Sequence, residues 1–182
     1  MLVLAPIALA APQGGVVAAG QARIATTGNL TTVTQQTARS IIDWRGFNVS
    51  TNEAVNFIQP ATSSVTLNRV GGADPSSILG RITANGRIFL VNPNGVLFGA
   101  GAQVNVGGLV ASTANISNGN FMAGVDRFDQ PGNANAMVEN RGTIRIADGG
   151  IAAFVGRRVR GFFVPGSPSG GAKHLGRYAV QA

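Results

Sequence analysis

The ionisable side chains of this chain are too few and too scattered to form a recognisable catalytic site. Its 182 residues include one histidine, His174, and no cysteine, which excludes a thiol nucleophile and a cysteine-ligated metal. The seven acids are Asp43, Glu53, Asp74, Asp126, Asp129, Glu139 and Asp148. Only Asp126 and Asp129 are close together, in a stretch that we interpret as a solvated loop. Because metal sites and glycosidases need clustered carboxylates, the sequence predicts a protein that is not an enzyme and needs no cofactor or metal.

The most distinctive short run is Asn92-Pro93-Asn94-Gly95. Proline fixes φ near −65° at the first corner of a turn, and the Asn-Gly pair after it tolerates left-handed geometry. The side chain of Asn92 can bond back to the backbone two residues on. Taken alone, the run therefore predicts a tight turn and no chemistry.

The positive charge of the chain belongs mainly to its end. Fourteen Lys and Arg against seven acids give a net charge of +7. The last 26 residues hold no acid and five of these cations, namely Arg157, Arg158, Arg160, Lys173 and Arg177. The remaining body carries nine cations against seven acids and is nearly neutral. Without a basic stripe that includes stacking aromatics, no specific nucleic-acid binding is expected.

The elements that must position these residues are short strands. A hydrophobic content of 45% argues against disorder. No apolar stripe of helical period is sustained over three turns, and 26 glycines indicate frequent turns. Thirteen strands are predicted, at Val16–Ala19, Ala22–Thr26, Leu30–Thr34, Ser40–Asp43, Ala54–Ile58, Ser64–Arg69, Arg81–Thr83, Arg87–Val91, Val96–Phe98, Gln103–Val106, Leu109–Ser112, Thr143–Ala147 and Ile151–Val155. This all-β pattern fits a sandwich, a barrel or a parallel β-helix.

An internal repeat favours the β-helix. The segment Gly80–Val91 recurs as Gly142–Val155, 62 or 63 residues later. Three coils of about 20 residues would fill that offset, as in solenoid proteins. Inward side chains would then stack from coil to coil, and turn asparagines would form ladders along the axis. Residues 16–34 are predicted to cap the N-terminal end, and Trp44 to anchor the core or the cap.

The two ends of the chain differ from the body. Residues 1–11 are apolar and too few to span a bilayer as a helix. They contain Ala8-Leu9-Ala10, which matches the A-x-A pattern of signal-peptidase cleavage sites, so they are interpreted as a residual signal segment. Residues 12–159 form the predicted β-helix domain. Residues 160–182 are interpreted as an irregular basic tail from a truncated or frame-shifted gene. With that end of the helix uncovered, the chain is expected to be marginally stable or to associate through that end.

Several ordered blocks of the sequence resemble the N-terminal secretion domain of filamentous-haemagglutinin-type proteins. The blocks are Ser40–Val49, Val55–Phe57, Ser64–Val70, Ile78–Arg81, Asn85–Gly99, Gly107–Thr113 and Ile116–Asn118. The likeness runs from about Gly15 to Val159. It is nearer to the high-molecular-weight adhesins, because Asp74-Pro75-Ser76-Ser77 stands where filamentous haemagglutinin itself has a second Asn-Pro-Asn element.

The resemblance implies a two-partner secretion domain folded as a right-handed parallel β-helix with an N-terminal cap. Its implied partner is an outer-membrane barrel transporter with periplasmic POTRA domains, and Asn92, Pro93, Asn94 and Gly95 correspond to the transporter-recognition motif. The exoprotein would cross the periplasm and reach the cell surface or the medium, where an adhesive passenger would contact host-cell glycans or proteins. A carbohydrate-binding or polysaccharide-cleaving β-helix is the alternative.

Overall fold

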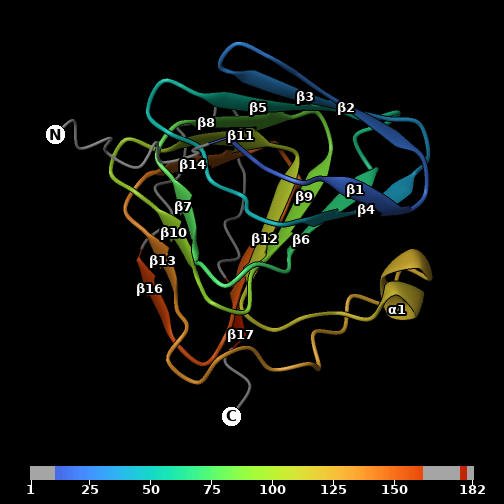
Figure 1. The fold of residues 1–182 in the computed structure, drawn as a ribbon. Helices are drawn as coiled ribbons and strands as arrows, with labels where there is room; N and C mark the ends of the chain where they lie inside the picture. Colours follow the sequence, from blue (N-terminus) through green and yellow to red (C-terminus); the bar gives the residue numbers. More distant parts are fainter. Residues whose placement is uncertain (1–10, 162–176, 180–182) are drawn as a thin grey trace, which may run out of the picture.

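The computed structural model describes residues 11–161 and 177–179, which form a parallel β-solenoid of about six turns with one short helix. Figure 1 looks along the solenoid, whose three sheets enclose a triangular interior. The seven-stranded sheet contains β1 (Val16–Ala19), β4 (Arg39–Trp44), β6 (Val65–Val70), β9 (Arg87–Val91), β12 (Gly108–Ser112), β15 (Ala152–Val155) and β17 (Arg177–Ala179). The six-stranded sheet contains β2 (Ala22–Thr27), β3 (Leu30–Gln35), β5 (Ala54–Ile58), β8 (Arg81–Ala84), β11 (Gln103–Val106) and β14 (Thr143–Ile146). The four-stranded sheet contains β7 (Ser76–Ile78), β10 (Val96–Phe98), β13 (Val138–Asn140) and β16 (Val159–Gly161).

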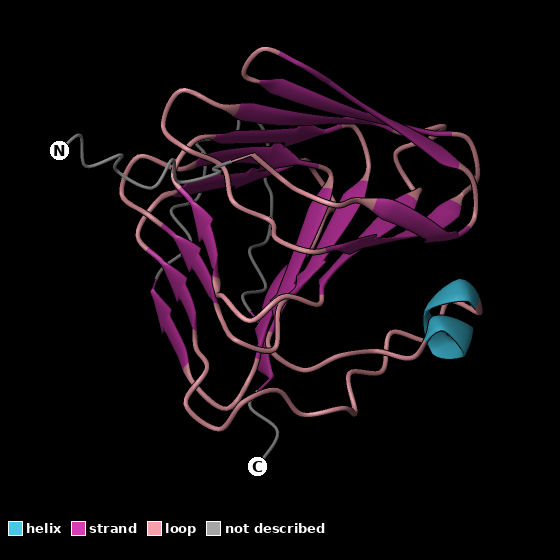
Figure 2. Ribbon diagram, viewed as in Figure 1, coloured by secondary structure: helices cyan, strands magenta, loops and turns pink. Residues whose placement is uncertain are grey.

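Each complete coil visits the three sheets in the same order, so the predicted right-handed parallel β-helix is confirmed. Four complete coils run β5–β6–β7, β8–β9–β10, β11–β12–β13 and β14–β15–β16. Every strand in them pairs in parallel with the equivalent strand of a neighbouring coil. An earlier, partial coil consists of β3 and β4, with a parallel bridge from Val49 to Ile78 in place of its third strand. Figure 2 shows the strands of the three sheets joined by loops, with the single helix outside the sheets.

The repeat was assigned the wrong number of coils. Register pairs Arg81 with Gln103 and Gln103 with Thr143. The two halves of the repeat are therefore two coils apart, where three were predicted. The first interval is an ordinary 22-residue coil, and the second takes 40 residues because the chain leaves the solenoid after β12 and returns at β13. A fixed period of about 20 residues gave no means of detecting this excursion.

All thirteen predicted strands are present within a residue or two. Four further strands, β7, β13, β16 and β17, and the helix α1 (Asn118–Met122) were not predicted. These strands are three residues long, and β7 follows a proline. A run so short cannot display a two-residue alternation, so pairing with neighbouring coils, rather than local pattern, defines these strands.

The N-terminal cap is an antiparallel addition to the first coil. Strand β1 pairs antiparallel with β4, and β2 pairs antiparallel with β3. The predicted cap extended to residue 34, but β3 is already a parallel strand paired with β5, so the cap ends at Thr27. Trp44 is 3% exposed and packs edge-on against Phe47 with ring centroids 5.4 Å apart. Its predicted role as a core anchor is confirmed.

Residues 159–161 and 177–179 continue the solenoid. Strand β16 pairs with β13, and β17 pairs with β15. The expectation of an irregular tail is wrong for residues 160–161 and 177–179, whose strands extend two sheets. The rest of that segment, with His174, lies outside the described residues, as do residues 1–10 of the proposed signal segment.

Buried side-chain amides align the coils at the corner between the six-stranded and seven-stranded sheets. Gln59 is 5% exposed. Its Nε2 donates to Thr66 Oγ1 at 3.0 Å and to the carbonyl of Arg87 at 3.1 Å, while its Oε1 accepts from the amide of Gly86 at 2.9 Å. Thr66 in turn donates to Oε1 of Gln35 in the coil before. One chain of hydrogen bonds therefore ties three successive coils together.

Replacing Gln59 with Ala is expected to lower the free energy of unfolding by about 3 kcal/mol, because buried groups from two coils lose their partner. Urea denaturation followed by circular dichroism measures this change. Gln103→Ala, at an exposed position of β11, is the matched control and should stay within about 0.5 kcal/mol of the parent. Equal midpoints for the two variants would contradict a structural role for the Gln59 amide.

Candidate functional site

The run Asn92–Gly95 forms the corner between β9 and β10, where the chain passes from the seven-stranded sheet to the four-stranded sheet. The amide of Gly95 donates to the carbonyl of Asn92 at 3.0 Å, which closes the turn. Gly95 has a φ of +126°, and a Cβ there would lie 3.2 Å from the carbonyl oxygen of Met137 in the next coil. The predicted tight turn is confirmed, and both the backbone angle and the close neighbour favour glycine at its end.

Asn92 is fully buried and uses both ends of its amide. Its Nδ2 donates to the carbonyl of Asp74 and to Oγ of Ser76, each at 3.0 Å. Its Oδ1 accepts from the amide of Asn94 at 2.9 Å. Its exposed fraction is 0%, so in the folded domain this side chain is not available to another protein.

Asn94 links the turn to the coils on both sides. Its Nδ2 donates to the carbonyl of Gly72 at 2.8 Å in the coil before, and its Oδ1 accepts from Nδ2 of Asn133 in the coil after. The amide of Asn133 also donates to the carbonyl of Pro93 at 2.9 Å. Of the predicted ladder of turn asparagines, the described residues show one pair, Asn94 with Asn133, whereas Asn92 bonds to serine and backbone groups.

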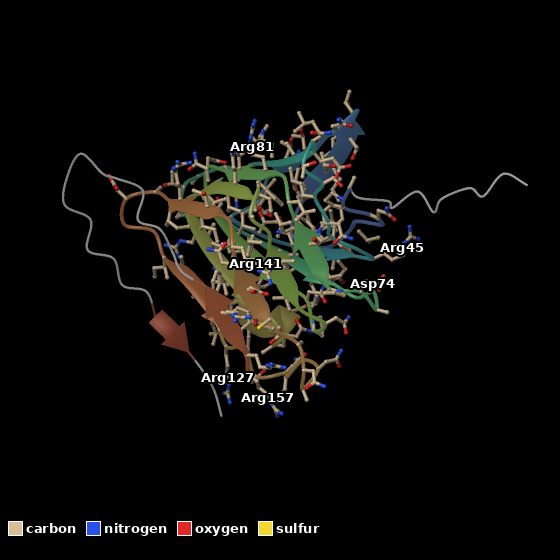
Figure 3. All side chains as sticks on the ribbon, turned by 90° about the vertical axis from the view of Figure 1, so that its left-hand side faces the viewer. Arg45, Asp74, Arg81, Arg127, Arg141 and Arg157 are labelled. Atoms are coloured by element: carbon tan, nitrogen blue, oxygen red, sulfur yellow. The ribbon has the colours of Figure 1, made fainter. Side chains whose placement is uncertain are left out.

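The Asp74–Ser77 segment lies directly beside the turn. Ser76 and Val96 are register partners in adjacent coils, and the amide of Ser76 donates to the carbonyl of Gly95 at 3.0 Å. The Asp74–Ser77 segment therefore contacts the Asn92–Gly95 turn directly. Figure 3 shows Asp74 at the end of the solenoid nearer the N-terminal coils.

The excursion between β12 and β13, residues 113–137, folds back as a strap over the outer face of the seven-stranded sheet. Ser117 caps α1 by accepting from the amide of Asn120 at 3.2 Å. Phe121 of α1 is fully buried, and its ring centroid lies 5.8 Å from that of Phe89. The strap covers outward-facing residues of three coils and forms a second apolar core of Ile41, Val65, Leu67, Phe89, Val91, Ile116 and Phe121. Figure 1 shows α1 beside this sheet, outside the triangle.

Two arginines hold the strap to the first two coils. Arg39 of β4 pairs with Asp126 at 2.9 Å and lies over the ring of Phe121, 4.3 Å from its centroid. Arg69 of β6 donates to Oδ1 of Asn118 at 2.6 Å and to the carbonyl of Ile116 at 3.4 Å. The strap is therefore fixed by both polar and apolar contacts.

Residues 126–129 form the predicted solvated loop, with Asp126, Arg127 and Asp129 exposed and only Phe128 half-buried. Asp126 pairs with Arg39 and Asp129 with Arg127, so the two acids do not form a carboxylate pair. Phe128 packs against Phe89 with ring centroids 5.8 Å apart. Sequence analysis missed the strap residues. Their one signal was that large apolar side chains recur in an otherwise turn-like stretch.

Other charged groups show no catalytic arrangement. The side chain of Glu139 accepts from Nε of Arg141 at 2.9 Å, and this hydrogen bond together with the carboxylate charge raises the pKa of Arg141 above its ordinary value. Across residues 11–161 and 177–179, no group of three or more acids, histidines or cysteines is placed to hold a metal ion. In the same residues no helix has the length and apolarity to cross a membrane.

A family model described as the TPS secretion domain matches residues 8–173, which is most of the chain. The chain belongs to this family. A heme/hemopexin-binding protein of Haemophilus influenzae is 40% identical over 140 residues, which are 77% of this chain and 14% of that protein. The crystal structure of the HMW1 secretion domain from Haemophilus influenzae matches with a TM-score of 0.79 and 36% identity, over 85% of this chain and 41% of that one.

The resemblance to two-partner secretion domains is therefore confirmed. TPS secretion domains belong to secreted exoproteins that use a partner outer-membrane transporter, and the family is a non-enzymatic secretion module. The comparisons give no support to the carbohydrate-binding alternative. The chain spans only 14% of the first relative's length, so the activity of such a complete exoprotein is not assigned to this TPS domain by similarity.

Removing the ring of Phe121 is expected to destabilise this TPS domain by about 3–5 kcal/mol, because the second core loses its central side chain. Met122→Ala is the matched control, since Met122 is the next residue of α1 and is 39% exposed. Thermal unfolding of both variants measures the difference. A Phe121→Ala variant as stable as Met122→Ala would mean that the strap does not stabilise the solenoid.

Proposed function

We propose that this domain targets a longer exoprotein to its outer-membrane transporter, and that it does so without catalytic activity. The observation that carries the proposal is the match of residues 8–173 to the TPS secretion domain family. The dispersed acids support the absence of catalysis, because each of Asp43, Asp126 and Asp129 is paired with an arginine of its own. In this proposal the chain crosses the periplasm and is recognised there by POTRA domains of the transporter.

In this proposal the transporter recognises the motif Asn92, Pro93, Asn94 and Gly95 before the domain folds. The support is the burial of Asn92, whose amide is fully used within the folded solenoid. In an unfolded chain the same side chains and the backbone of β10 are free, and an extended segment can add a strand to an exposed sheet edge of the partner. Pro93 favours an extended or turn conformation of this segment even before folding.

Folding on the far side of the membrane then opposes backward movement. The turn is held by Gly72 and Asp74 from the coil before and by Asn133 from the coil after. The strap closes over the first coils only after residues up to Phe128 have emerged, because Asp126 and Phe128 contact Arg39 and Phe89. Each emerging coil adds contacts that are lost if the chain slides back.

Host-cell binding belongs to the passenger in this proposal. The similar Haemophilus proteins are named for heme or hemopexin binding, and this chain covers 14% and 10% of their lengths. We assign binding of host glycans or proteins to the region that follows the secretion domain in such exoproteins.

The double replacement of Asn92 and Asn94 by Ala is expected to reduce export at least tenfold in cells that carry the cognate transporter. Secreted and periplasmic protein are quantified by immunoblot. Asn52→Ala with Asn105→Ala is the matched control, since both asparagines are exposed, and it should export normally.

A second comparison separates recognition from stability. Gln59→Ala weakens the solenoid at a different corner of the same coils but leaves the motif intact. If both variants lose the same stability, the Gln59→Ala protein should therefore be exported in larger amount than the Asn92/Asn94 variant. Equal export by variants of equal stability would contradict direct recognition of the motif.

A further inference from the structure

The outer face of the seven-stranded sheet is apolar beyond the part that the strap covers. One outward row crosses the sheet in register, and its members are Ile41, Leu67, Phe89, Val110 and Ala153. The strap buries the first three, whereas Val110 and Ala153 are only half-buried. Ile151, next to this row, is 60% exposed. Contiguous exposed apolar surface of this kind often marks a binding site.

The open part of the face is a pocket of about 530 Å³. The end of the strap, residues 126–128, forms one wall, and the strands β9, β12 and β15 form the floor. The apolar lining residues are Phe89, Leu109, Val110, Phe128, Ile151, Ala153 and Val155. This volume lies within the range of roughly 300–1,000 Å³ that is typical of small-molecule sites.

An arginine that forms no ion pair with the described residues, Arg87, borders the pocket. A Cβ at Gly108 would lie 3.2 Å from Cγ of Arg87, so the stem of Arg87 lies over this glycine on the pocket floor. The other charged lining residues are already paired, Asp126 with Arg39 and Arg127 with Asp129. Within the described part of the chain, the guanidinium of Arg87 makes no ion pair. Gly108 thus leaves room, and Arg87 supplies a charge, for a ligand with an apolar body and an anionic head.

We propose that this pocket binds a single acyl chain with a carboxylate at its end. The chain lies over Val110 and Ala153 against the ring of Phe128, and the carboxylate pairs with Arg87. A strand face bordered by one aromatic wall fits a narrow flexible chain, and a guanidinium is the preferred partner for a carboxylate. This site is separate from the Asn92–Gly95 turn, and it does not depend on the function proposed above.

Titration of the folded chain with monomeric decanoate tests the site. Amide shifts of Gly108, Val110 and Ile151 should saturate with a Kd of about 1 mM or tighter. Affinity should rise about fourfold per added methylene from octanoate to dodecanoate, in proportion to the apolar surface buried. Decylammonium, with the same body and the opposite charge, should bind at least tenfold more weakly.

Two variants locate the binding determinants. Arg87→Gln should weaken decanoate binding about tenfold, and Phe128→Ala should weaken the whole series. Arg81→Gln is the matched control, because Arg81 is also the exposed first residue of its strand and lies on the opposite side of the molecule from Arg127 (Figure 3). The control should bind like the parent.

The same assay can overturn the proposal. Absence of saturable shifts at up to about ten times the expected Kd would exclude the site. Equal binding of decylammonium, or an Arg87→Gln variant that binds like the parent, would exclude the anionic head. Vesicles of phosphatidylglycerol distinguish a membrane source of the acyl chain from a free one, and sedimentation with vesicles without binding of monomeric decanoate would contradict a single-chain pocket.

Discussion

Hydrogen bonds from buried amides at the coil corners are the constraint on which the rest of this domain depends. A strand that slips by one residue turns all its inward side chains outward and is opposed by the loss of apolar burial. A slip by two residues keeps the same face inward, so apolar burial alone opposes it less. Gln59 and Asn92 have several specific partners each, at two different corners of the triangle. Because an unpaired buried amide is costly, a coil with the wrong register is penalised at both corners.

The second core explains an unusual feature of β6. This strand is buried on both faces, with Thr66 and Asn68 turned inward and Val65 and Leu67 turned outward. Inside, Asn68 accepts from Nε1 of Trp44 at 3.0 Å. Outside, Leu67 packs beneath the strap. The solenoid interior is therefore partly polar, and the domain gains additional apolar burial from the strap, which follows β6 in the chain after six further strands.

The sequence predicts the features that repeat and misses those that do not. Alternation identifies twelve strands of four residues or more, and Asn92–Gly95 identifies its turn and the three-residue strand β10 that follows it. The other three-residue strands have no periodicity to detect, and the 40-residue coil hides an excursion that only register reveals. Alternation also cannot tell whether Val65 and Leu67 face the solenoid or the strap, since both environments are dry. The candidate turn was predicted as a motif, but its partners in neighbouring coils belong to tertiary structure.

In the proposed order of events the transporter recognises Asn92–Gly95 before the domain folds, because Asn92 is fully buried afterwards. Hydrogen exchange at the amides of Asn94 and Gly95 tests this order most directly, because both donate to Asn92 in the folded turn. In the free folded domain both should be as protected as the neighbouring amides of β10. In a chain trapped on the periplasmic domains of its transporter, both should exchange at the rate of an unfolded peptide. Native-like protection of these two amides in the trapped complex would contradict the account.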